Sequence, residues 1–248
     1  MGRADEALSM LDEKMPSQRF LARIWPGQFR DVLASGLVDQ SFALQKCGRD
    51  AEAAAAADQA VLIFRELAAA RPAKFTAGQA DALFRVSYPL AVVTGRDEAL
   101  AAAAEVVQLY RGLAAASPVK YASPLIMSLT RQAILLAGLG RSGDALTAVT
   151  DAADLYQAAT PAGELPYSGA HALLLQGRVL CDLSRPHEAA RPLARGWQLA
   201  ESRDYQDLLD FARPALQIAY QADPAGFTST WHAETGTAPP DWLTLAAG

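Results

Sequence analysis

Residues 95–118, GRDEALAAAAEVVQLYRGLAAASP, contain the pattern that decides the fold. A Gly-Arg pair is followed by two acidic residues, and alanine, leucine and valine then recur at helical spacings, with no glycine until Gly112. The only proline of the stretch, Pro118, stands at its end. Acidic residues stabilise the first turn of a helix, and alanine and leucine have high helix propensity. The stretch therefore predicts one long α-helix between two turns.

The same layout recurs along the chain with a period of 46 residues. Each unit contains an aromatic residue that opens a largely apolar run, and in three units a second aromatic residue lies 11 positions before it. The first set is Phe29, Phe75, Tyr121 and Tyr167, and the second set is Phe64, Tyr110 and Tyr156. Strict register over several copies indicates a repeat protein, in which each unit packs on its neighbours.

The turns between the predicted helices repeat as well. Glycine and arginine stand together, followed within a few residues by an acidic residue and alanine, at Gly2-Arg3, Gly48-Arg49, Gly95-Arg96 and Gly140-Arg141. Ser184-Arg185-Pro186, before an acidic residue and alanine, is a degenerate fifth copy. Glycine suits the left-handed position that ends a helix, so each of these sites is predicted to be a corner between two helices.

A second helix precedes the corner in each unit. Residues 121–139, YASPLIMSLTRQAILLAGL, place Leu125, Leu129 and Ala133 on one helical face and run into Gly140. Sustained polar and apolar alternation with β-branched residues is missing from the sequence, so strands are not expected. The predicted fold class is all-α, built of antiparallel helix pairs.

These residues resemble the tetratricopeptide repeat family. A corner glycine, a small residue five positions later and another seven further on match the packing positions of that family at Gly48-Ala53-Ala60 and Gly140-Ala145-Ala152. The period exceeds the usual repeat of the family. It is similar to the extended repeats of kinesin light chains and of actinobacterial repeat proteins, most clearly at FRELAAARP (64–72) and YRGLAAASP (110–118).

The resemblance implies a right-handed α-solenoid, in which the first helix of each pair lines a concave groove that holds peptides. HEAT-like repeats have similar periods and are the structural alternative. The recurrent Gly-Arg corner followed by an acidic residue and alanine favours the tetratricopeptide type.

The repeats are predicted to occupy residues 1–223, as about 4.5 to 5 copies, and residues 224–248 to form a C-terminal capping segment. The tail carries Trp231 and Trp242. We expect both indoles to be buried against the last helix pair, since a flexible polar tail has little reason to hold two tryptophans. Pro214, inside the last helical run, predicts a kink or a break there.

Residues 2–22 read as the second helix of a pair whose partner is missing. An unpaired helix leaves an apolar face open. Either the chain is the C-terminal part of a longer array, or this helix packs against another protein or a second copy of the chain. A lone helix that simply caps the stack is the other alternative.

Composition narrows the classes of partner. Hydrophobic residues make up 51% of the 248 residues and charged residues 20%, which is typical of a folded chain with much buried surface. The net charge is −5 with both signs mixed, so neither nucleic acid nor a membrane is an expected partner.

No secretory signal pattern opens the chain, and a cytoplasmic location is expected. Cys47 and Cys181 are expected to be reduced.

The motifs of catalysis are missing from the sequence. His171, His187 and His232 have no second histidine or cysteine at metal-ligand spacing. The sequence has no GxSxG motif and no P-loop, and no GxGxxG between a predicted strand and a helix. We therefore expect no enzymatic activity, no catalytic residue, no metal and no cofactor.

The most informative polar residues lie ten positions after the first set of aromatic residues. They are Asp39, Arg85, Arg131 and, beside Gly177, Arg178. Stacked repeats would turn this register into a stripe along the groove, with Gln132 and Gln176 as further hydrogen-bond donors. Guanidinium groups bind carboxylates through paired hydrogen bonds, so the stripe predicts a site for an acidic segment or a C-terminal carboxylate. The alternative is that these arginines form internal ion pairs with acidic residues of adjacent helices, for example Asp39 or Asp81.

The sequence therefore favours a non-enzymatic scaffold that binds a protein or peptide in its groove. The alternative is a regulatory sensor domain for a small ligand or a signalling peptide, as part of a larger effector protein. An enclosed apolar pocket would favour the sensor, and an open, charged groove would favour the scaffold.

Overall fold

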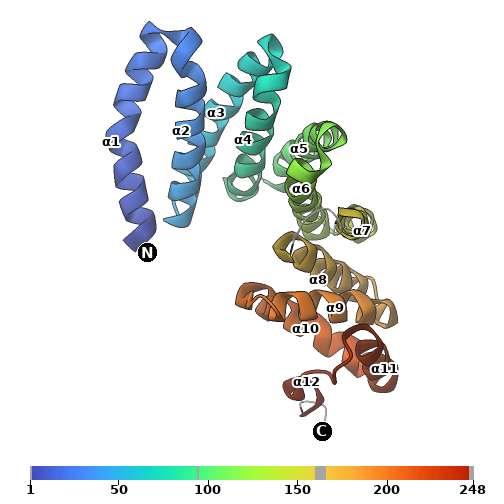
Figure 1. The fold of residues 1–248 in the computed structure, drawn as a ribbon. Coiled ribbons are helices and arrows are strands. Elements are labelled where there is room, and N and C mark those ends of the chain that lie inside the picture. The colour runs from blue at the N-terminus through green and yellow to red at the C-terminus, as the bar shows by residue number, and fades with distance from the viewer. Residues whose placement is uncertain (1, 94, 160–165, 246–248) are drawn as a thin grey trace. The chain divides into compact units, whose positions relative to one another are not determined.

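Figure 1 shows the structure, a computed structural model that describes residues 2–93, 95–159 and 166–245. Within these ranges, the side chains of residues 2, 3, 86, 88–93 and 245 lie outside the description. The described residues form twelve α-helices and no strand. This confirms the all-α fold class.

The chain divides into two compact units, residues 1–116 and residues 117–248. The first unit contains α1 (Gly2–Ile24), α2 (Pro26–Lys46), α3 (Asp50–Ala70), α4 (Pro72–Val93) and α5 (Arg96–Ala116). The second contains α6 (Pro118–Gly138), α7 (Ser142–Ala159), α8 (Pro166–Asp182), α9 (Pro186–Glu201), α10 (Gln206–Ala222), α11 (Pro224–Thr235) and α12 (Asp241–Leu245). Consecutive helices pack on one another from α1 to α5 and from α6 to α11, and α12 packs on α10. In addition α2 contacts α4, and α8 contacts α6 and α10. This is the packing of stacked helix pairs.

Two of the three aromatic residues in the second set, Phe64 and Tyr156, pack against a glycine of the following helix. A Cβ atom at Gly78 of α4 would lie 2.5 Å from the ring of Phe64 in α3. Gly169 of α8 has the same relation to Tyr156 of α7, at 2.3 Å. Neither position has room for a side chain, because the two helices approach closely around the ring. The large and the small partner therefore occur together in two of the three units that carry this aromatic residue.

The corners combine a left-handed residue with an ion pair. Gly48 and Gly140 have φ angles of 73° and 75°, and Ser184 adopts the same conformation at 58° in the degenerate fifth corner. The arginine after each of these residues forms an ion pair with the acidic residue three positions later, in Arg49–Glu52, Arg141–Asp144 and Arg185–Glu188. The recurrent sequence pattern is thus a helix end followed by a charge pair in the first turn of the next helix.

We expect Gly140→Ala to destabilise the protein by about 1–2 kcal/mol, because in the left-handed conformation an alanine Cβ crowds the following carbonyl oxygen. Gly143→Ala is the matched control. Gly143 lies inside α7, and a Cβ atom there would meet nothing within 4 Å. The control should leave stability unchanged or raise it, because alanine favours helix. Urea unfolding followed by circular dichroism makes the comparison, and equal midpoints would contradict the assigned corner.

The last helices of the second unit share an aromatic core. Trp197 of α9 lies near Trp231 of α11 and Trp242 of α12, with ring centroids 6.5 Å and 5.8 Å apart. Phe227 stacks on Trp231 at 5.6 Å. Trp231 is only 2% exposed, and Trp242 is half-buried. The tail therefore contributes side chains to the core around α9 and α10. The boundary between repeats and capping segment at residue 223 stays a prediction.

Helix α10 continues through Pro214, so the chain does not break there, and the kink that the sequence also allowed stays a prediction. Proline removes one backbone hydrogen bond from a helix interior. The neighbouring Ala212, Ala215 and Leu216 are buried against the rest of the unit. This packing, rather than local propensity, maintains the helix across the proline.

Candidate binding groove

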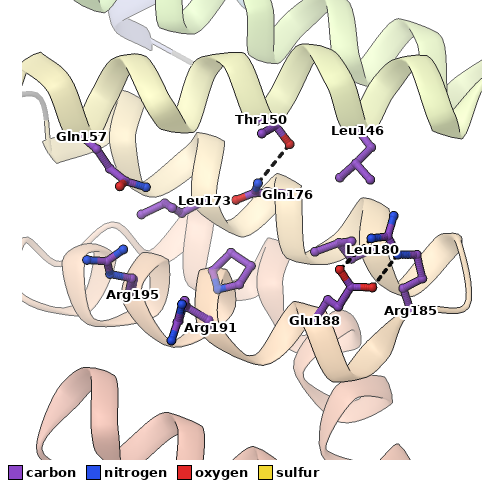
Figure 2. Close-up of a pocket in the computed structure, with 11 residues that line it drawn as sticks. Leu146, Thr150, Gln157, Leu173, Gln176, Leu180, Arg185, Glu188, Arg191 and Arg195 are labelled. Carbon is purple, nitrogen blue, oxygen red and sulfur yellow. Dashed lines mark hydrogen bonds and ion pairs between the residues drawn. The ribbon is translucent and has the colours of Figure 1, made fainter.

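A groove in the second unit runs between α7 and α9, and α8 forms its floor, as Figure 2 shows. Its volume is about 310 Å³, and it is lined by Leu146, Thr150, Gln157, Leu173, Gln176, Leu180, Arg185, Glu188, Arg191, Pro192 and Arg195. A second hollow of about 710 Å³ shares Gln157, Leu173 and Arg195 with it and continues along α9. Together they form one elongated groove.

The floor of the groove is apolar. Leu173 and Leu180 project from α8, Leu146 projects from α7, and Pro192 completes the surface on α9. Leu173 and Leu180 are each 5% exposed, so the groove ends on the core of the unit. Apolar side chains of a ligand would lose contact with water on this floor, which is the main source of affinity in concave sites.

The wall formed by α9 is basic. Arg191 and Arg195 are four residues apart, so their side chains lie on the same face of the helix. Figure 2 shows both along the groove edge, with Arg185 at the end where α9 begins. Arg185 forms a bidentate interaction with Glu188, whose pKa is lowered by these hydrogen bonds. Glu188 therefore stays ionised, and its charge offsets that of Arg185.

The other two arginines converge on a single carboxylate. Arg191 Nε lies 2.7 Å from Oε1 of Glu234, and Arg195 Nε lies 3.2 Å from Oε2. The Glu234 side chain, from α11, is 17% exposed. Two guanidinium groups facing one carboxylate leave an excess of positive charge on this wall. The pair acts as a carboxylate clamp that is already engaged within the chain.

Neutral polar groups complete the groove. Gln176 of α8 donates a hydrogen bond from Nε2 to Oγ1 of Thr150 at 3.1 Å, as the dashed line in Figure 2 shows. In the adjoining hollow, Gln198 donates from Nε2 to the backbone carbonyl of Thr235 at 3.2 Å. These amides connect the floor to α7 and the wall to α11.

Of the six residues that the sequence selected, Gln176 lies in this groove. Arg178, two positions later on α8, lies instead over the ring of Phe211 in α10, with Cζ 4.8 Å from the ring centroid. Two positions on a helix are separated by about 200°, so Gln176 and Arg178 point to opposite sides of α8. Arg131 and Gln132 are half-buried on α6 and do not line the groove.

The remaining two predicted residues belong to the first unit. Arg85 of α4 forms an ion pair with Asp81, with Nε 3.3 Å from Oδ2, and its guanidinium lies 4.9 Å from the centroid of the Phe42 ring. Arg85 therefore has an internal ion pair with Asp81, one of the two residues the sequence named, but the pair lies within α4 and does not connect adjacent helices. Asp39 is exposed and lines a hollow of about 370 Å³ between α1 and α2. A continuous arginine stripe stays a prediction.

His171 of α8 lies among aromatic rings on the same side as Arg178. The rings of Tyr167 and Phe211 are 6.1 Å and 5.8 Å from it. Burial lowers the pKa of His171 to about 4; Arg131 adds to this effect, and Asp207 opposes it. Tyr167 donates a hydrogen bond to Asp207 at 2.7 Å, and burial together with this bond raises the pKa of Tyr167 to about 12. Both side chains are neutral near pH 7, as in a packed structural cluster.

Sequence reasoning missed Arg191, Arg195 and Glu234. The two arginines form an i, i+4 pair in the second helix of the last, degenerate repeat, whereas the predicted stripe lies in the register of the first helix of each pair. Glu234 stands 39 residues beyond Arg195, in the tail, and no periodicity connects them. Only the packing of α11 on α9 brings them together.

Metal centres and membrane spans were also considered for the described residues. Its histidine, cysteine and acidic side chains nowhere gather in threes as a metal centre would require. Within the same residues, every helix falls short of the length or the apolarity needed to cross a bilayer.

Two solved structures have folds similar to that of this chain. The crystal structure of BtubC (BKLC) from P. vanneervenii matches with a TM-score of 0.68 and 13% identity, over 98% of this chain and 91% of that one. The apo form of RapI matches with a TM-score of 0.65 and 13% identity, over 90% of this chain and 75% of that one. No family model and no curated protein matches the sequence. The likeness supports a helical repeat solenoid.

Proposed function

We propose that the chain is a non-enzymatic scaffold of the tetratricopeptide type, which binds an acidic peptide segment of a partner protein in the groove of the second unit. The observation that carries the proposal is the convergence of Arg191 and Arg195 on the carboxylate of Glu234. Their geometry suits a carboxylate of a partner equally well, whether it belongs to a side chain or to a C-terminus.

The floor adds a second requirement on the ligand. Leu146, Leu173 and Leu180 lie beside the basic wall, so a peptide with an apolar side chain next to a carboxylate would contact both surfaces. Apolar floor and basic wall together favour such a peptide over a nucleic acid, whose phosphates would leave the floor uncovered. The charged wall also favours a scaffold over a sensor that encloses a small apolar ligand.

Binding is expected to depend on salt. Arg191 is 71% exposed and Arg195 is 46% exposed, so their interaction with a ligand carboxylate is screened by dissolved ions. The apolar contacts on the floor are not weakened in this way. The proposed ligand should therefore lose part of its affinity, but not all of it, as the salt concentration rises.

The arginine stripe is a second proposed location for an acidic ligand. In the second unit it comprises Arg131 and Arg178, on the other side of α8 from Gln176. A ligand carboxylate there would have to compete with the Phe211 ring for the Arg178 guanidinium. A ligand carboxylate in the groove between α7 and α9 would likewise have to compete with Glu234, but there two arginines lie beside an apolar floor, which favours the groove for a peptide with a carboxylate next to an apolar side chain.

Selection of random peptides displayed on phage against the immobilised full chain tests the proposal. Enriched peptides should carry aspartate or glutamate next to leucine, isoleucine or phenylalanine, and should bind more weakly as sodium chloride is added. Enrichment of peptides without carboxylates, or no enrichment at all, would overturn it. The variants Arg131→Glu/Arg178→Glu and Arg191→Gln/Arg195→Gln distinguish the two locations. If only the first variant lost peptide binding, the binding site would be the stripe and not the groove.

A further inference from the structure

The last turn of α11 is attached to the second unit differently from the rest of that helix. Phe227 and Trp231 are each 2% exposed and pack into the core around α9 and α10. Beyond Trp231 the contacts with α9 are polar: Glu234 pairs with two arginines, and the backbone carbonyl of Thr235 accepts a hydrogen bond from a glutamine. Water and dissolved ions compete for contacts of this kind, whereas they strengthen apolar packing by being excluded from it. The end of α11 is therefore the part that a ligand can detach.

The three residues of α9 that hold this turn also line the groove. They are Arg191, Arg195 and Gln198. At 100° per residue they lie within about 60° of one another, whereas Pro192 and Leu199, which also line the groove, lie about 40–120° further around the helix. The three polar side chains thus form a border on α9, with Glu234 on one side and the apolar part of the groove on the other.

We propose that docking of the last turn of α11 and binding of a ligand carboxylate exclude each other, so that Glu234 is an internal ligand which a bound peptide displaces. This inference rests on the function proposed above. Glu234 engages the Nε atoms of both Arg191 and Arg195. A peptide that covers the apolar floor lies across the border from Glu234, and its carboxylate draws the two guanidinium groups to that side. Glu234 then loses both ion pairs, and the turn that carries it loses its attachment.

The released segment is limited by packed residues on both sides. Trp231 precedes it and Leu243 of α12 follows it, and each is 2% exposed. Between them, α11 ends at Gly236, which has a left-handed φ of 73°. Peptide binding is therefore expected to open the chain locally around residues 232–238, and to leave the aromatic core in place. The empty and the occupied groove would then present different surfaces at the end of α11.

Hydrogen exchange of the Gly236 amide, measured by NMR, tests the attachment without a ligand. This amide donates to the carbonyl oxygen of His232 at 2.9 Å, so it is protected while the last turn is formed. Glu234→Gln should speed its exchange about fivefold, because two partly exposed ion pairs are lost. Glu66→Gln is the matched control, since it removes the carboxylate that pairs with Arg30 in the first unit, and it should have no effect. Equal exchange in the wild type and in Glu234→Gln overturns the inference.

The same measurement with a peptide from the phage selection tests the displacement. A saturating peptide should speed exchange of the Gly236 amide in the wild type, also about fivefold, and should change it little in Glu234→Gln. A peptide that binds but leaves the exchange unchanged, or slows it, shows that Glu234 and the ligand carboxylate share the clamp. That result overturns the displacement and leaves the proposed function standing. A selection without any binding peptide contradicts the proposed function itself, and the displacement with it.

Weakening the last turn tests the coupling in the reverse direction. Ala233 is exposed on α11 and lines neither hollow of the groove. Ala233→Gly disfavours the helix at this point, so by linkage it should raise the affinity for the peptide about threefold. Ala101→Gly makes the same change at an exposed position of α5 in the first unit, and it should leave the affinity unchanged. An unchanged or lower affinity in Ala233→Gly, with the variant folded by circular dichroism, overturns the inference.

Discussion

Replacing Arg191 and Arg195 with glutamine should weaken binding of a selected acidic peptide about 30-fold. Each guanidinium–carboxylate interaction at this partly exposed wall is expected to contribute about 1 kcal/mol to the free energy of binding. Glutamine keeps most of the side-chain length and removes the charge. With glutamate at both positions, like charges would face the ligand carboxylate, and binding should fall below detection. Fluorescence anisotropy with a labelled peptide from the selection measures both effects.

Two further variants distinguish a direct contact between the two arginines and the peptide from an effect of the net charge of the protein. Arg71→Glu, at the exposed C-cap of α3, makes the same change of charge in the first unit and should leave the affinity unchanged. Glu234→Gln removes the carboxylate that occupies the clamp in the free protein, so it should raise the affinity. If Glu234→Gln weakened binding as much as the arginine variants do, the arginines would act by holding α11 in place and not by contacting the peptide.

The helical repeat could be predicted from the sequence because its determinants are local. Each corner needs a left-handed residue, an arginine and an acidic residue within a few positions of one another, as at Gly140, Arg141 and Asp144. The aromatic residue of the second set and the glycine it packs against, such as Phe64 and Gly78, are also close in sequence. Patterns of this length repeat with the period of the fold.

The candidate groove could be predicted only in part, because its residues meet through contacts that do not follow the repeat. The repeat register selected Gln176 and Arg178 for one and the same site. Because they are two residues apart, however, their side chains lie on opposite sides of α8. The clamp depends on Glu234, which reaches Arg191 and Arg195 only because α11 packs on α9. The guanidinium of Arg178 lies over the ring of Phe211, and the repeat period does not predict this contact.

Replacing Trp231 with alanine should destabilise the second unit by about 3–5 kcal/mol. Trp231 is 2% exposed and contacts Phe227 and Trp197, so the substitution leaves a large cavity between α9 and α11. Because Glu234 lies one turn later on α11, the loss should also loosen its contact with Arg191 and Arg195. Urea unfolding followed by circular dichroism measures the change in the free energy of unfolding.

Trp25→Ala is the control for this substitution. Trp25 precedes α2 and is 53% exposed, so removing its indole should cost far less, within about 0.5 kcal/mol for a surface position. Trp231→Phe should lie between the two variants, because phenylalanine refills part of the cavity and removes a buried indole N–H that has no hydrogen-bond partner. If Trp231→Ala unfolded at the same urea concentration as Trp25→Ala, the tail would contribute nothing to the core of α9 and α10. The clamp would then have to be held by the two ion pairs of Glu234 alone.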